Sequence, residues 1–115
     1  MRGLILITVP ITVLSLLGCT KVQVPTERSE ASIRGAEEVG AEAVPAARLH
    51  LQLAKEQTTT AKAMAAQGDQ RALLVMARAE SDAELAIGLA REAAVHNDAL
   101  KAAEDLKAVR DRNTP

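Results

Sequence analysis

Six alanines and one methionine recur between residues 72 and 93 at alternating intervals of four and three residues, and this repeat is the feature that most constrains the fold. A mean interval of 3.5 residues places every member on one face of an α-helix, whereas residues on one face of a strand recur at every second position. Because alanine side chains are short, helices that pack along such a face lie close together. The repeat therefore predicts a long helix with a narrow packing face, called the seam. The seam consists of Ala72, Met76, Ala79, Ala83, Ala86, Ala90 and Ala93, and Asn97 and Leu100 continue its register.

The amino-acid composition agrees with a thin helical core. Twenty-three alanines and 20 Leu, Ile, Val or Met residues follow Cys19, and the chain of 115 residues contains no Phe, Tyr or Trp. Alanine is the best helix former but buries little apolar area, and aromatic rings normally supply much of a small core. We therefore expect one small all-α domain of modest stability.

Turn signals divide residues 27–110 into three predicted helices. Thr26 is expected to cap a first helix that begins near Glu27, and the stretch from Gly40 to Pro45 separates it from the second, residues 46–67. Gly68 and Asp69 then end the second helix and start the third, residues 70–110. So short a connection makes neighbouring helices antiparallel. The prediction is an antiparallel helical hairpin preceded by a shorter N-terminal helix.

The packing of these helices can also be predicted. Gly35 within the first helix suggests a close backbone approach to a neighbour, and Leu51 is expected to face the first helix. The second helix is about 33 Å long, so the third is expected to overhang it past Asn97, and residues 111–115 are expected to form a disordered tail. The stripe predicted on the second helix is Ala46, Leu49, Leu53, Ala54, Gln57, Ala61, Met64 and Ala65.

The N-terminus has the pattern of a secretory signal peptide. Arg2 is followed by 16 uncharged residues up to Gly18. This segment is about 24 Å long as a helix, which is short for a bilayer span, and Pro10 would kink it. A buried strand is the alternative, but no other strand is predicted for it to pair with. Residues 1–18 are therefore predicted to be a cleaved signal peptide.

The end of that segment, Leu16-Leu17-Gly18-Cys19, resembles the lipobox of bacterial lipoproteins. The resemblance implies cleavage between Gly18 and Cys19, a diacylglyceryl thioether on the cysteine sulfur, and an acyl chain such as palmitate on its freed amine. Two or three such chains make a lasting membrane anchor. Residues 19–26 would then form a lipidated tether. Thr20, where an aspartate would favour the inner membrane, suggests the outer membrane, with the protein facing the periplasm.

No pattern in the sequence indicates catalysis. Hydroxyl-bearing residues are not placed with a histidine by their spacing, and no glycine-rich phosphate loop is present, so an enzyme is not expected. The chain has 14 basic and 15 acidic residues, a balance that argues against nucleic acid as a partner. The two histidines, His50 and His96, are expected to lie in the same neighbourhood of the hairpin. With Glu92 and Asp98 they could hold a metal, although a surface position for both is the simpler interpretation.

Two longer segments carry a second resemblance. Residues 33–57, with the stretch from Leu51 to Glu56, and residues 68–93, with the stretch from Asp82 to Ala86, are similar to small alanine-rich bacterial lipoprotein domains of unknown function. The resemblance implies an exported, lipid-anchored helical hairpin with an added N-terminal helix. In some relatives the domain is joined to a peptidoglycan-binding module. No such module is found in this sequence, which argues against direct binding to the cell wall.

Three functional hypotheses follow. The first is an anchored structural or interaction module of the bacterial envelope, which binds an envelope protein or itself and requires no cofactor beyond its covalent lipid. The second, from a different class, is a periplasmic small-ligand or metal-binding module that uses His50 and His96. The third is a coiled-coil spacer similar to the major lipoprotein of enteric bacteria, but the C-terminal lysine used there for wall linkage is replaced here by Pro115.

Overall fold

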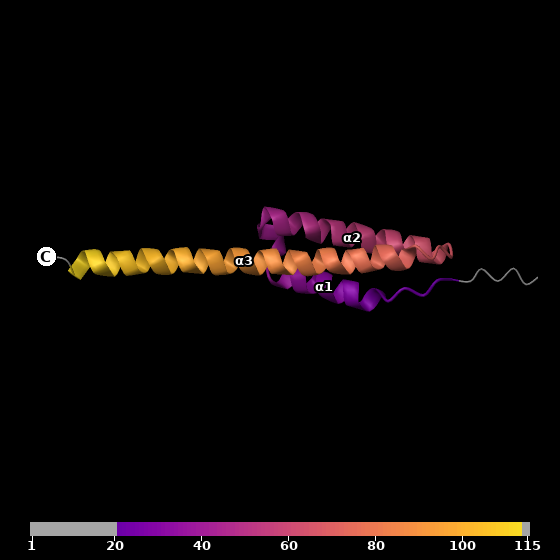
Figure 1. The fold of residues 1–115 in the computed structure, drawn as a ribbon, viewed down its shortest axis with the longest axis horizontal. Helices are drawn as coiled ribbons and strands as arrows, with labels where there is room; N and C mark the ends of the chain where they lie inside the picture. Colours follow the sequence, from indigo (N-terminus) through magenta and orange to yellow (C-terminus); the bar gives the residue numbers. More distant parts are fainter. Residues whose placement is uncertain (1–20, 114–115) are drawn as a thin grey trace, which may run out of the picture.

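The computed structural model describes residues 21–113, and this part of the chain is all-helical, as predicted. In chain order it contains α1 (Thr26–Glu38), the short 3-10 helix η1 (Ala41–Ala43), α2 (Pro45–Ala66) and α3 (Ala72–Asn113). Both α1 and α2 pack against the first half of α3, and the second half of α3 extends beyond them as a single helix (Figure 1). The fold is a short three-helix bundle from which one long helix protrudes.

The connection between α2 and α3 makes the two helices antiparallel. At Gly68 φ is +77°, and its N–H donates to Ala65 O at 3.0 Å while the Asp69 N–H donates to Met64 O at 3.0 Å. These bonds satisfy carbonyls that the end of a helix leaves unpaired. The Asp69 carboxylate then accepts the N–H of Arg71 at 2.9 Å, directly before α3. Gly68 thus ends α2 as predicted, and Asp69 caps the turn that leads into α3.

The connection between α1 and α2 is a second glycine turn. α1 ends at Glu38, and Gly40 has a φ of +77°, which favours a residue without a side chain. After η1, the extended residue Val44 precedes Pro45 at the first position of α2, where its missing N–H costs nothing. The predicted break between Gly40 and Pro45 is therefore confirmed, with a short 3-10 turn inside it.

The seam of α3 is buried from Ala72 to Ala90. Each of its six members in this range is at most 3 % exposed. Ala93 is half-buried, whereas Asn97 and Leu100 are exposed, so the overhang begins near residue 91, earlier than predicted. One end of the seam belongs to a cluster that α1, η1, α2 and α3 share, formed by Ala36, Ala41, Ala47, Leu51, Ala86 and Ala90.

The buried face of α2 differs from its predicted stripe. Leu49 is 56 % exposed and Ala46 is exposed, while Leu51, expected as an exception, is 2 % exposed. The prediction considered one neighbour, but α2 packs against both α1 and α3, so its buried face is turned between the two. Of the predicted stripe, Ala54, Ala61 and Ala65 are buried, and Leu53, Gln57 and Met64 are half-buried.

Polar contacts hold α1 in place. The Ser29 and Thr58 hydroxyls lie 2.6 Å apart in the buried interface between α1 and α2. Gly35 faces α3, but a Cβ there would meet only the tip of the Ile87 side chain at 3.4 Å, so the predicted close backbone approach is wrong. Ion pairs around α1 are Lys62–Glu30 at 2.5 Å, Lys55–Glu37 at 2.5 Å and Arg28–Glu80 at 3.1 Å.

Several predicted helix boundaries shift. α3 begins at Ala72, two residues after its predicted start. Thr26 is the first residue of α1 and not its cap, because Pro25 occupies the cap position with a φ of −74° and the helix starts directly after it. At the other end, α3 continues to Asn113, so residues 111–113 are helical and not disordered. Arg112 Nε donates to Ala108 O at 3.2 Å. Basic residues in the last turn also stabilise the helix, because their charge lies near the negative end of the helix dipole.

Candidate functional site

The residues of the predicted lipid attachment site lie outside the described part of the chain. Leu16, Leu17, Gly18 and Cys19 all precede Lys21, where the described residues begin. The structure shows instead where the chain that follows them joins the bundle.

Residues 21–25 run along the end of α2 and do not stand away from the bundle. The Val22 N–H donates to Ala65 O at 3.2 Å. Val22 and Val24 are half-buried, whereas the residues between and beside them are exposed. With Lys62 and Ala66, this segment lines a shallow depression at the end of α2. The described part of the tether is therefore docked at the end of the bundle where α2 turns into α3, called the hairpin-turn end (Figure 1).

His50 takes part in a polar contact across the interface of α2 and α3. Its Nδ1 lies 2.8 Å from Asp82 Oδ1, and Gln57 Nε2 donates to Asp82 Oδ2 at 2.8 Å. The His50 and Asp82 side chains are 27 % and 17 % exposed, and Gln57 Oε1 is buried without a hydrogen-bond partner. Asp82 thus joins two side chains of α2 to α3, an arrangement that fixes the register of the hairpin. Sequence reasoning missed the roles of Asp82 and Gln57.

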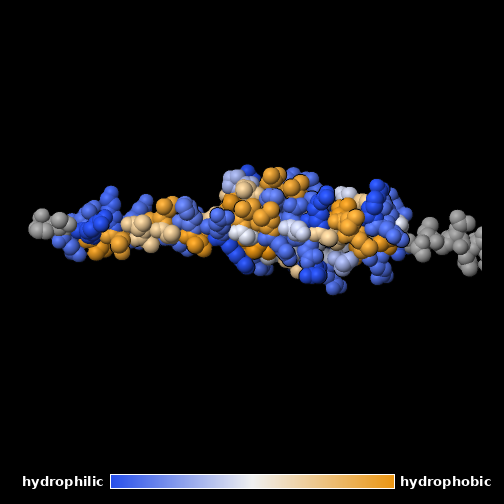
Figure 2. All heavy atoms as spheres, in the orientation of Figure 1, coloured by the Kyte–Doolittle hydropathy of each residue, from blue (hydrophilic) through white to orange (hydrophobic). Residues whose placement is uncertain are grey.

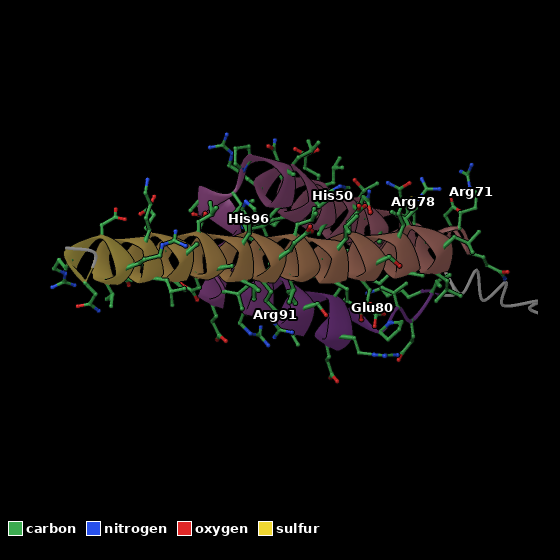
Figure 3. The ribbon with its side chains drawn as sticks, turned by 60° about the vertical axis from the view of Figure 1, so that its left-hand side comes forward. His50, Arg71, Arg78, Glu80, Arg91 and His96 are labelled. Atoms are coloured by element: carbon green, nitrogen blue, oxygen red, sulfur yellow. The ribbon has the colours of Figure 1, made fainter. Side chains whose placement is uncertain are left out.

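His96 does not lie with His50. It is exposed on the second half of α3, 14 residues or about 21 Å along the helix from Asp82, and Figure 3 shows it well towards the C-terminus from His50. The predicted shared neighbourhood is wrong. His50 lies inside α2 and not at its start, and the residues of the turn between α2 and α3 shift the pairing of the two helices. His50 therefore lies beside Asp82 and not beside His96. Glu92 and Asp98 are exposed near His96. Residues 21–113 contain no group of three or more His, Cys, Asp or Glu side chains placed to hold a metal ion.

The second half of α3, residues 91–113, has little contact with the bundle and is called the arm. Every residue of the arm except Ala93 is exposed. Apolar side chains gather along it in the space-filling view (Figure 2). Among them, Val95 is 69 %, Leu106 is 75 % and Val109 is 49 % exposed. On the arm these large apolar side chains have no neighbouring helix of the bundle beside them.

These side chains do not continue the seam. They recur at intervals of four and three residues, as the seam does, but each lies two positions after a residue of the seam register. They therefore lie about 200° around the helix from the seam. Sequence reasoning followed the seam register alone, and counting a second register would have found them. They form the arm stripe, Val95, Ala99, Ala102, Leu106 and Val109, whereas the seam register of the arm carries Asn97, Leu100, Glu104, Lys107 and Asp111.

Comparisons with known proteins add no family. Within residues 21–113, no helix combines the length and the apolar character that crossing a bilayer requires. No family model, curated protein or solved structure matches the chain. The resemblance to small alanine-rich lipoprotein domains therefore stays a prediction from the sequence.

Proposed function

We propose that this protein is a lipoprotein of the bacterial envelope, anchored through lipid on Cys19, whose bundle holds the arm ready for protein interaction. It acts as a structural or interaction module and not as an enzyme. The anchor is in the outer membrane, with the bundle in the periplasm.

The observation that carries this proposal is the placement of the two ends of the bundle. The Val22 N–H bonds to Ala65 O near the hairpin-turn end, and covalent geometry keeps Cys19 within about 11 Å of Val22. The arm leaves the bundle at the opposite end (Figure 1). α3 has 42 residues, which corresponds to about 63 Å of helix. A lipid on Cys19 can therefore hold the protein without covering the arm.

The chemistry of the N-terminus supplies the second support. A small residue before the cleaved bond lets a peptidase approach, and the cysteine thiol is the nucleophile that receives the diacylglyceryl group. Cys19 is the one cysteine of the chain, so lipid chemistry has a single thiol to act on. The metal or ligand alternative needs His50 and His96 together, and the structure separates them.

Metabolic labelling with palmitate tests the anchor. We expect label on the wild-type protein, no label on Cys19→Ala, and unchanged label on the neighbouring control Thr20→Ala. Gly18→Leu should also lose mature labelled protein, because a large residue then precedes the cleaved bond. Label that persists on Cys19→Ala, or absence of label from the wild type, would contradict the proposal.

Membrane fractionation tests the location. Wild-type protein should sediment with outer-membrane vesicles, and Thr20→Asp should move protein to the inner-membrane fraction. Wild-type protein in the soluble periplasmic fraction would overturn the anchored function, whatever the palmitate label shows.

A further inference from the structure

We propose that the arm stripe binds the arm stripe of a second copy of this chain, with the two α3 helices antiparallel. The proposal rests on the proposed function in one respect, the use of the arm as the interaction surface. It does not depend on the lipid.

The face that carries the arm stripe continues into the bundle and stays accessible there. Glu92, Gly88 and Leu85 precede Val95 in the same register, at successive intervals of three, four and three residues. Leu85 is 46 % exposed, and a Cβ at Gly88 would meet nothing within 4 Å. Bonds from α1 reach Glu80 and bonds from α2 reach Asp82, which flank the seam on the other side of α3. A second helix can therefore lie along this face without displacing α1 or α2.

Side-chain sizes along this face match in one antiparallel register. When the two helices cross with residue 97 at the centre, Leu106 faces Gly88 of the second copy, and Val109 faces Leu85. Val95 faces Ala99, so Leu106 and Val95 each lie opposite a small side chain, and Val109 and Leu85 are the one pair of large side chains that face each other. A small residue opposite a large one is what close packing of two helices requires.

Charges beside the stripe favour the same register. One flank repeats every seven residues as Glu84, Arg91, Asp98, Asp105 and Arg112. In the antiparallel register Arg91 faces Asp105 of the second copy and Glu84 faces Arg112, and each of these pairs occurs twice. Asp98 faces Asp98 of the second copy, which is the one like-charge contact on this flank. Residues that flank a helix interface in this way set partner choice and orientation.

A parallel pair is disfavoured by Glu92. Its position lies in the stripe register, so two parallel helices would place Glu92 against Glu92 of the second copy within the interface. In the antiparallel register Glu92 faces Ala102, whose small side chain leaves room for the carboxylate to reach water. The antiparallel orientation therefore avoids the buried Glu92–Glu92 contact and gains four favourable flanking pairs against one exposed Asp98–Asp98 contact.

The antiparallel pair has a consequence for the anchor. Each hairpin-turn end lies about 27 residues from the centre, so the two ends are about 80 Å apart. Lipids on both copies can enter one membrane when the pair lies along its surface. An upright pair would hold two facing membranes instead.

Cysteine cross-linking in native membranes tests the proposal on the full-length chain. The variant with both Gly88→Cys and Leu106→Cys should form a disulfide-linked dimer under mild copper oxidation. Leu106→Cys alone should not, because the two copies of residue 106 would be about 27 Å apart. A matched control, Gly88→Cys with Glu104→Cys, places the second thiol on the seam side of the arm and should not cross-link. Wild type reports any cross-link through Cys19.

A charge exchange tests the register without altering the stripe. In the Gly88→Cys and Leu106→Cys background, Arg91→Asp or Asp105→Arg should each reduce the dimer several-fold, and the two together should restore it. A dimer from Leu106→Cys alone would overturn the antiparallel orientation. No dimer from the double cysteine variant, or cross-links to other proteins alone, would overturn self-association.

Palmitate labelling of the same samples separates the two proposals. Cross-linked but unlabelled protein contradicts the lipid anchor and supports the antiparallel pair. Labelled protein without the cross-link contradicts the pair and leaves the anchor supported.

Discussion

The two halves of α3 are one continuous helix with similar alanine content but opposite packing. From residue 72 to 90 the small residues of the seam face α1 and α2, and the seam is at most 3 % exposed. From residue 91 the seam register turns polar, and apolar side chains move to the far side of the helix. The change occurs beside the start of α2 at Pro45 and the end of α1 at Glu38. One face of this helix therefore packs against its own bundle, and a second face leaves apolar side chains exposed.

The largest difference between the halves is expected from leucine truncation. Leu51→Ala should lower the free energy of unfolding by about 3 kcal/mol, because Leu51 is 2 % exposed and its removal leaves a cavity that alanine neighbours cannot fill. Leu106→Ala, in the arm, should change the unfolding of the bundle by less than about 0.5 kcal/mol. Urea unfolding followed by circular dichroism measures both. Equal losses would show that arm and bundle do not differ in packing.

The next largest effect concerns the polar contact at Asp82. Asp82→Ala should lower the free energy of unfolding by about 1–3 kcal/mol, since His50 and Gln57 then lose their shared acceptor inside the interface. The matched change in the arm, Asp98→Ala, removes an exposed carboxylate and should be nearly neutral for folding. Asp82→Asn keeps an acceptor and should recover part of the loss. If Asp82→Ala and Asp98→Ala unfold at the same urea concentration, the contact does not stabilise the hairpin.

These comparisons also show what the sequence could reveal. The seam and the glycine turns were predictable, because a 3.5-residue repeat and a glycine with positive φ depend on nearby residues alone. The buried face of α2 was not, since Leu49 and Leu51 are distinguished by the presence of a third helix. The partner of His50 depends on a register shift of a few residues, which the length of the connecting turn decides.

The features of the candidate site likewise differ in how far they could be predicted from the sequence. The lipobox is a local pattern, so Cys19 could be named from four adjacent residues. The arm stripe is also a local pattern, but it is visible only after the seam has been assigned to the bundle and its register has been set aside. The docking of Val22 on Ala65 could not be foreseen, because it joins residues 43 positions apart through a backbone bond.

Replacement of a glycine inside α1 or α3 should have a smaller effect on the free energy of unfolding, and this effect should be stabilising. Gly35→Ala and Gly88→Ala should each raise the free energy of unfolding by about 0.5–1 kcal/mol, because alanine is the better residue inside a helix. At position 35 the new methyl would touch Ile87 at 3.4 Å, and at position 88 it would meet nothing within 4 Å. Urea unfolding of both variants measures the gain. A loss at position 35 would mean that α1 approaches α3 more tightly than the structure shows.

The smallest effect is expected from a fall in pH, which should weaken the packing of α1 against the rest of the bundle. A hydrogen bond from Lys62, together with its charge, lowers the pKa of Glu30 below its ordinary value. Folding then favours the ionised carboxylate, so this contribution to stability is present above the unfolded pKa and is lost as the pH falls through the folded pKa. The pair is exposed, which keeps its contribution small. NMR titration of the Glu30 carboxyl should show the lowered pKa in the wild type and a higher pKa in Lys62→Ala, in which only the charge of Arg34 still lowers it. Amide exchange at low pH should rise in α1 before it rises along the seam, and identical titration in the two proteins would show that Lys62 does not hold α1 on α2.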